Sequence, residues 1–229
     1  MSKISKISKI SQRVYYLKII YCMRVAVLIY GRINKCIEHY DNIMKHLCQN
    51  HHVDFFLSSD NSTQKLLDKF IILYKPVTYN NDKIHYDYNL GKYPGGRPEI
   101  TNERMHNMTC HFINKNRVFI LLEKYIHSFK KKYDCVVSLR IDAVFKNKFD
   151  FRELKENTIY IPFGSDYTGT NDQIAYGKID VMRKYNSINP LYLLENKLSI
   201  PHPESLTRTN IYMHKLNIER PMIKYHLHR

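Results

Sequence analysis

Glycine is scarce in this chain, with 7 among 229 residues, and tryptophan is absent. Many nucleotide-binding folds hold phosphates in a glycine-rich loop at the start of a helix, and so few glycines disfavour such a loop. No G-x-G-x-x-G motif follows the first predicted strand, which covers residues 24–30. The ordinary dinucleotide-binding fingerprint is therefore excluded.

The chain also lacks paired cysteines. Its five cysteines are an odd number and include no C-x-x-C pair, which argues against a disulfide framework and against a structural zinc site. We expect buried free thiols instead. The cysteines are Cys22, Cys36, Cys48, Cys110 and Cys135.

No apolar run is long enough to span a membrane. Lys18 and Arg24 interrupt the apolar stretch at residues 14–30, whereas a spanning helix needs roughly 20 predominantly apolar residues. Before this stretch, Ser-Lys-Ile occurs three times between Ser2 and Ile10. We interpret residues 1–22 as a basic appendage that is able to contact a membrane surface peripherally, and residues 23–229 as one domain. Because no signal peptide is evident, we expect a cytoplasmic protein.

What the chain has in excess is positive charge. Lys and Arg number 36 against 21 Asp and Glu, which gives a formal net charge of +15. Such a field attracts polyanions, so a basic nucleic-acid-binding or structural protein is one alternative. The basic residues are spread along the chain, with a denser run at Lys130–Lys132, so no specific nucleic-acid partner is expected.

Apolar periodicity predicts an α/β fold. A buried strand at 24–30, a helical pattern at 34–48 and a second strand at 53–57 form a βαβ unit. We expect a single domain with a central, mostly parallel, twisted sheet flanked by helices. The further expected elements are a short helix at 63–70, a strand at 71–74, a long loop at 75–98, a helix at 102–132 with a break near Asn114, strands at 133–142 and 158–162, and helices at 171–185 and 204–216.

Polar residues follow three of these strands directly. They are Gly31-Arg32, Ser58-Ser59-Asp60 and Arg140-Ile141-Asp142. Ligand sites of open parallel sheets lie beyond the carboxyl ends of the strands, so we expect these residues to converge on one crevice. Asp142 beside basic residues suits a diphosphate bridged by Mg²⁺ or Mn²⁺, and Arg140 suits a bidentate phosphate contact. The alternative is that Asp142 only caps the next turn.

The order of motifs resembles that of glycosyltransferases encoded by large DNA viruses and by bacterial polysaccharide clusters. The motifs are Tyr133-Asp-Cys-Val-Val-Ser-Leu-Arg-Ile-Asp142 after a long helix, Asn171-Asp-Gln-Ile-Ala-Tyr-Gly177 before another, and His202-Pro-Glu204 before a last helix and a terminal His. The resemblance covers nearly all of residues 23–229. It implies the GT-A fold, whose donor site usually carries an Asp-x-Asp motif that binds a divalent metal and the diphosphate of a nucleotide sugar. Here Arg140 replaces the first acid, so Asp142 is the only motif ligand.

The resemblance also implies roles for residues. The protein would transfer a hexose or deoxyhexose from a nucleotide sugar to a glycan or lipid-linked acceptor, with Asp172 as general base, Glu204 in reserve, and Mn²⁺ or Mg²⁺ bound by Asp142 and His226. If the protein is viral, its location would be the host cytoplasm. The further donor and acceptor residues would be Gly31, Arg32, Ser59, Asp60, Arg140, Asn171 and Gln173.

Two alternatives stay open besides nucleic-acid binding. Another nucleotide-dependent transferase, such as a sulfotransferase or nucleotidyltransferase, can use the same kind of sheet, although the missing phosphate loop disfavours it. His226 and His228 alternate along an extended end of the chain, and a solvated tail would explain them without a metal.

Overall fold

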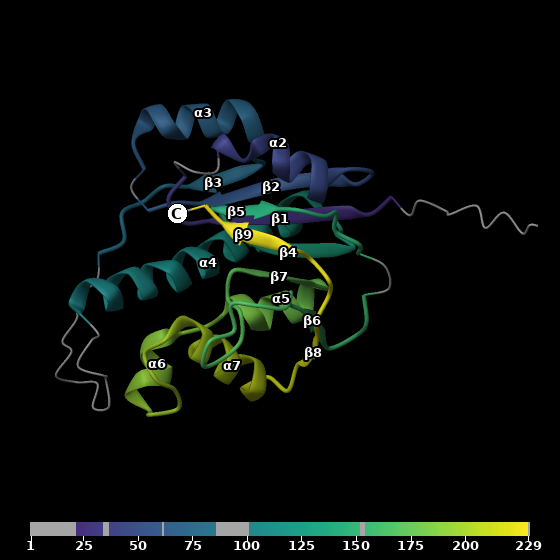
Figure 1. Ribbon diagram of the computed structural model, residues 1–229. Coiled ribbons are helices and arrows are strands. Elements are labelled where there is room, and N and C mark those ends of the chain that lie inside the picture. Colours follow the sequence, from purple (N-terminus) through teal and green to yellow (C-terminus); the bar gives the residue numbers. More distant parts are fainter. Residues whose placement is uncertain (1–21, 34–36, 61, 86–100, 152–153, 229) are drawn as a thin grey trace, which may run out of the picture.

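The computed structural model describes residues 22–33, 37–60, 62–85, 101–151 and 154–228, which fold into three layers with a sheet in the middle (Figure 1). The seven strands follow the order β3-β2-β1-β4-β7-β6-β8. Their bounds are β1 (Arg24–Tyr30), β2 (His52–Ser58), β3 (Thr78–Asn80), β4 (Cys135–Arg140), β6 (Thr158–Tyr160), β7 (Ile174–Gly177) and β8 (Asn217–Glu219).

Only β7 runs against its neighbours in this sheet. It pairs antiparallel with β4 and β6, whereas β1 pairs parallel with both β2 and β4, β2 with β3, and β6 with β8. The mostly parallel sheet flanked by helices confirms the predicted fold class. The chain leaves β1 for β2 on one side and returns to β4 on the other, so the sheet has a topological switch point between β1 and β4.

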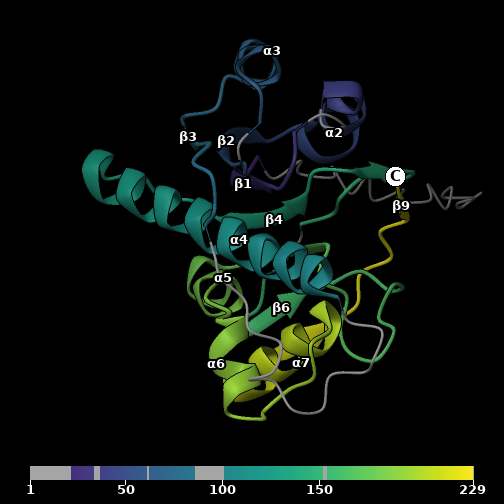
Figure 2. The same cartoon turned by 90° about the vertical axis from the view of Figure 1, so that its left-hand side faces the viewer.

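Helices cover both faces of the sheet, as the end-on view shows (Figure 2). Helix α2 (Tyr40–Ile43), the wider π-type turn η1 (Met44–Cys48) and α3 (Gln64–Tyr74) lie on one face. The other face carries α4 (Asn102–Phe129), α5 (Ile179–Asn186) and α7 (Pro203–Met213), and α6 (Pro190–Glu195) packs against α4 and α7.

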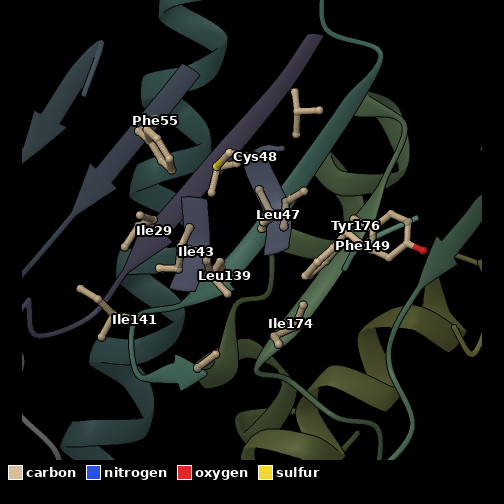
Figure 3. Close-up of a cluster of buried hydrophobic side chains, with 14 of the residues drawn as sticks. Ile29, Ile43, Leu47, Cys48, Phe55, Leu139, Ile141, Phe149, Ile174 and Tyr176 are labelled. Atoms are coloured by element: carbon tan, nitrogen blue, oxygen red, sulfur yellow. The ribbon is translucent and has the colours of Figure 1, made fainter. Parts of the chain in front are cut away.

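Strand β1 shows why both faces must be covered. Its alternate residues Val25, Val27 and Ile29 join the cluster under α2 and α3, part of which Figure 3 shows. The residues between them join the cluster under α4 and α5. Because successive side chains of a strand point to opposite faces, an uninterrupted apolar run needs a helix layer on each side.

The end of the second helix was predicted wrongly. Residues 71–74 continue α3 and do not form a strand, because Leu67, Phe70 and Tyr74 are buried at helical spacing against the sheet. The third strand is instead β3, within the segment that was predicted to be a loop. Asn114 does not break α4, because the Ser58 hydroxyl donates to its side-chain oxygen over 2.8 Å and ties the unbroken helix to β2.

Residues 171–185 also differ from the prediction. Residues 171–173 form no helix or strand, β7 follows at Ile174–Gly177, and the helix α5 starts only at Ile179. Both faces of β7 are buried in the sheet, so its short apolar run does not reveal its type by periodicity.

A small second sheet joins the end of the chain to the region after β4. Strands β5 (Ala143–Phe145) and β9 (Tyr225–Leu227) pair antiparallel beside α2. Beyond β9, the amide of His228 donates to the Asp142 carbonyl over 2.9 Å. The chain end therefore lies beside the carboxyl end of β4.

Some predictions fall outside the described residues. They concern residues 1–21, most of the long loop after β3 and Cys36. Within the described part of the chain, no helix has the length and apolar character needed to cross a bilayer.

Candidate functional site

A cavity of about 1000 Å³ opens at the carboxyl ends of β1, β2 and β4. The amino-terminal half of α4 contributes to its wall, together with Tyr167, Thr168, Asp172 and residues 200–203. The cavity therefore lies at the switch point between β1 and β4, where open α/β sheets bind their ligands.

Six of the residues predicted for the site line this cavity. Gly31 ends β1 with a backbone φ of +108°, a conformation that glycine adopts without a steric penalty, and its amide donates to the Ser58 carbonyl over 3.1 Å. The turn ties the ends of β1 and β2 together. The six residues are Gly31, Arg32, Asp60, Arg140, Asp142 and Asp172.

The other predicted residues do not line the cavity. Ser59 is buried, and its hydroxyl lies 2.5 Å from that of Ser62. Asn171 and Gln173 are buried and share the Tyr225 hydroxyl, which lies 2.6 Å from the Asn171 amide nitrogen and 2.8 Å from the Gln173 side-chain oxygen. These two side chains hold the strand-end loop against β9 and do not reach toward a ligand.

His226 is also absent from the cavity wall, where His228 appears instead. His226 pairs with Val144 within the small sheet and is exposed, whereas His228 lies just past the strand beside Asp142. The sequence did not reveal which of the two histidines reaches the cavity, because that depends on where the pairing of β9 with β5 ends.

Arg140 and Asp142 form a two-point ion pair. Arg140 Nε lies 2.9 Å from one carboxylate oxygen of Asp142, and Nη2 lies 3.2 Å from the other. Both oxygens are thus engaged by a cation of the same strand end. Each carboxylate oxygen has a second lone pair, so a divalent ion at Asp142 would share the carboxylate with this guanidinium, and the metal role of Asp142 stays a prediction.

Asp172 is the most buried carboxylate of the cavity. Its Oδ2 lies 3.1 Å from Nε2 of His111 on α4, and its side chain is 4% exposed. Burial raises the pKa of Asp172, but the hydrogen bond and charge of His111, together with Lys115 and Arg140, outweigh it and hold the pKa below the ordinary value. Asp172 is therefore a carboxylate that stays ionised next to a ring.

The His111 ring is held from two sides. It meets Tyr30 edge-on with ring centroids 5.1 Å apart, and the Tyr30 hydroxyl donates to the Asp172 carbonyl over 3.0 Å. Burial lowers the pKa of His111, although Asp172 acts in the opposite direction. The contacts with Tyr30 and Asp172 fix the orientation of the ring.

Glu204 has the opposite environment. Burial and the nearby charge of Asp172 raise the pKa of Glu204 to about 7. Its Oε2 lies 2.7 Å from Nδ1 of His202, which lines the cavity, although Glu204 itself does not. The site therefore holds two carboxylates whose surroundings move their pKa values apart.

A loop with an exposed aromatic ring borders the cavity. Gly164, Ser165 and Tyr167 all have positive φ angles, and the Tyr167 side chain is 73% exposed while it lines the cavity. Positive φ angles at residues other than glycine are unfavourable, and they are kept only where the surrounding structure holds the backbone in place. The loop thus presents an amphipathic ring at the entrance.

Sequence patterns did not identify several of these residues. His111 and Lys115 were missed because they lie within an apolar helical repeat, and their only signal is a spacing of four residues, which places them on one helix face. Tyr30 was missed because it completes an apolar strand. Tyr167 and His202 come from loops whose position only the tertiary structure determines.

Two groups of side chains in the described part of the chain have the composition and proximity of a metal site. In each, the ligand atoms all lie within 4.8 Å of one another. One group is Glu38, His39 and His228, and the other is Asp60, His106 and Cys110.

No protein-family model matches this chain, and neither does any curated protein sequence. Among solved structures, it is similar to the mannosyltransferase Ktr4p from S. cerevisiae, with 15% sequence identity and a TM-score of 0.48 over 90% of this chain and 70% of that chain. A similarity of this degree does not carry that protein's activity over to this one.

Proposed function

We propose that this protein is a glycosyltransferase that moves a sugar from a nucleotide-sugar donor to a glycan or lipid-linked acceptor. The observation that supports this most is the switch-point cavity, where guanidinium groups and a buried carboxylate line one space. Arg32, Arg104 and Arg140 line it together with Asp172. This combination suits an anionic donor and a reaction in which a proton must be removed from the acceptor.

The donor diphosphate would lie at the ends of β1 and β4. Arg140 is positioned there by its ion pair with Asp142, and its N–H groups that do not bond Asp142 can donate to a phosphate oxygen. Because Asp142 is already engaged, we propose that arginines neutralise most of the diphosphate charge. Donor binding is then expected without added Mn²⁺ or Mg²⁺.

Asp172 is the preferred general base. It lines the cavity and is held ionised, whereas Glu204 has the more suitable pKa of about 7 but does not reach the cavity wall. A base must first be within reach of the proton it accepts, and only then does its pKa matter. The contact with His111 would orient the Asp172 carboxylate and favour its ionised form.

The acceptor would enter past Tyr167. An exposed ring with a polar hydroxyl can pack on the apolar face of a sugar while its hydroxyl stays in water. The neighbouring loop residues Ile200 and Pro201 add apolar surface to the same wall. The acceptor site is thus proposed at the part of the cavity wall that Tyr167, Ile200 and Pro201 form.

A thermal-shift screen tests the function. Nucleotide sugars and nucleoside diphosphates are added to the full chain with and without Mn²⁺, and we expect at least one donor to raise the melting temperature, because a ligand that binds only the folded state stabilises it. Asp172→Asn should keep this shift and lose about 10²–10⁴-fold in turnover.

Asp68→Asn is the matched control, since Asp68 is an exposed carboxylate on α3, away from the cavity. It should retain both binding and turnover. The absence of a shift with every donor would reject the function, and an unchanged rate in Asp172→Asn would reject only the assigned base.

A further inference from the structure

We propose that Asp60, His106 and Cys110 form a binding site for a divalent transition metal such as Zn²⁺ at the edge of the cavity. The site is separate from the Asp142 position at which the sequence predicted a metal. It does not depend on the proposed sugar transfer.

The two ligands from α4 have suitable spacing. His106 and Cys110 are four residues apart, so both lie on one face of the helix, and Cys110 Sγ is 3.4 Å from His106 Nε2. Zinc binds sulfur at about 2.3 Å and imidazole nitrogen at about 2.0–2.1 Å, so two such ligands at a tetrahedral angle are roughly 3.5 Å apart. The observed separation matches that value.

The third ligand comes from the end of β2. The Asp60 carboxylate accepts the Ile84 amide over 2.9 Å, which fixes its position, and it acts on the Cys110 thiol both as a charge and as a hydrogen-bond partner. All three ligand atoms lie within 4.8 Å of one another. A helix and a strand end thus supply the ligands, and such supports hold ligand geometry better than loops do.

The chemistry of these ligands selects the metal. Thiolate and imidazole favour Zn²⁺ or Co²⁺, whereas Mg²⁺ and Mn²⁺ prefer oxygen ligands. The positive charges of Arg32 and Arg117 are close enough to act on Cys110, and they would also repel a bound cation. The thiolate of Cys110 and the carboxylate of Asp60 would offset this repulsion, because both negative charges would contact the ion directly. The thiol must give up its proton on binding, which is usual for metal sites.

The position of the site suggests that the ion is accessible. Asp60 and Cys110 both line the cavity, so a cation held by three protein ligands would leave one coordination position for water or for an anionic group in the cavity. The sequence disfavoured a structural zinc site because it has an odd number of cysteines and no C-x-x-C pair, and such a pattern does not reveal a ligand that lies 46 residues from His106. Only folding brings the three residues together.

Cobalt titration of the chelator-treated full chain tests this site. One equivalent of Co²⁺ should produce a near-ultraviolet thiolate-to-cobalt absorption band, and Zn²⁺ should abolish the band by displacement. Cys110→Ser should lose the band, and His106→Ala should weaken Co²⁺ binding by at least about 10–100-fold, the loss expected even for residues that only support a ligand. Asp60→Asn provides a third variant if one of these fails to fold.

Three controls isolate the site. Cys22→Ser removes an exposed thiol and His52→Ala an exposed imidazole, and both should keep the band. His228→Ala disrupts the second group, which contains no thiol and should not contribute to the band. Failure to form a band, or a band that survives in Cys110→Ser, would overturn the proposal whatever the outcome of the nucleotide-sugar screen.

Discussion

Lys115 is a lysine with no exposed surface. Its ammonium nitrogen has no hydrogen-bond partner among the described residues and lies 3.5 Å from the centroid of the Tyr185 ring. Burial lowers the pKa of Lys115 to about 7, and Asp172 opposes this only in part. A buried amine this close to Asp172 and His111 contributes to the electrostatics of the site at the expense of stability.

Replacing this amine should change how stability depends on pH. The pKa of Lys115 falls from the ordinary 10.5 to about 7 on folding, so the unfolded chain binds more protons between these values and stability rises with pH there. The slope is at most about 1.4 kcal/mol per pH unit. Lys115→Met should remove this rise and be at least as stable as the wild type at pH 7, as measured by urea unfolding at pH 7 and 9.

Lys124→Met is the control on the same helix, because Lys124 is exposed. It should keep the wild-type pH profile. A difference between Lys115→Met and the wild type that stays constant over this range would show that the folded pKa of Lys115 is not lowered.

At the scale of elements, the contact between Gly169 and Glu204 sets the distance between the loop that precedes β7 and the start of α7. A Cβ added at Gly169 would lie 2.0 Å from the Glu204 carbonyl oxygen, and the next amide, that of Thr170, donates to that oxygen over 2.9 Å. The loop can approach the start of α7 only because residue 169 has no side chain. The position of Glu204 relative to Asp172 depends on this approach.

Gly169→Ala should therefore separate the two elements. We expect a loss of about 1–3 kcal/mol in the free energy of unfolding, the range for overpacked interiors, because backbone atoms cannot move aside as a flexible side chain would. Chemical denaturation measures the loss. Gly177→Ala is the comparison, since its Cβ would meet backbone no closer than 3.2 Å and should destabilise less. Equal losses in both variants would contradict this explanation.

At the scale of the whole molecule, the net charge of +15 has two interpretations. In the first, the charge is spread over the surface and attracts any polyanion. In the second, the three arginines that line the cavity attract one small anionic ligand. The two interpretations differ in stoichiometry and in salt dependence. The cavity favours the second, because its volume of about 1000 Å³ suits a single nucleotide.

Calorimetric titration at 50 and 200 mM salt distinguishes these interpretations. We expect one nucleoside diphosphate per chain, with an affinity that changes by about tenfold at most between the two salt concentrations. Binding to duplex DNA through 6–10 phosphates would instead lose about 10³–10⁵-fold over this range. Tight DNA binding at 200 mM salt without nucleotide binding would favour the nucleic-acid alternative.

The sequence by itself determined the class of the fold. Apolar runs such as that of β1 require burial on both faces, and a glycine at the end of such a run indicates where the strand must turn. Because carboxyl ends of parallel strands meet at one edge, the convergence of residues after β1, β2 and β4 could be inferred without coordinates. Their chemical roles stay predictions.

Only the tertiary structure decided how these residues are partnered. That both Asp142 oxygens are engaged by Arg140, that His111 contacts Asp172, and that His228 lies at the cavity in place of His226 all depend on contacts between elements. Local periodicity reports which face of an element is buried, but not which distant side chain it meets. The ligand group of Asp60, His106 and Cys110 arises in the same way, where a helix crosses the end of a strand.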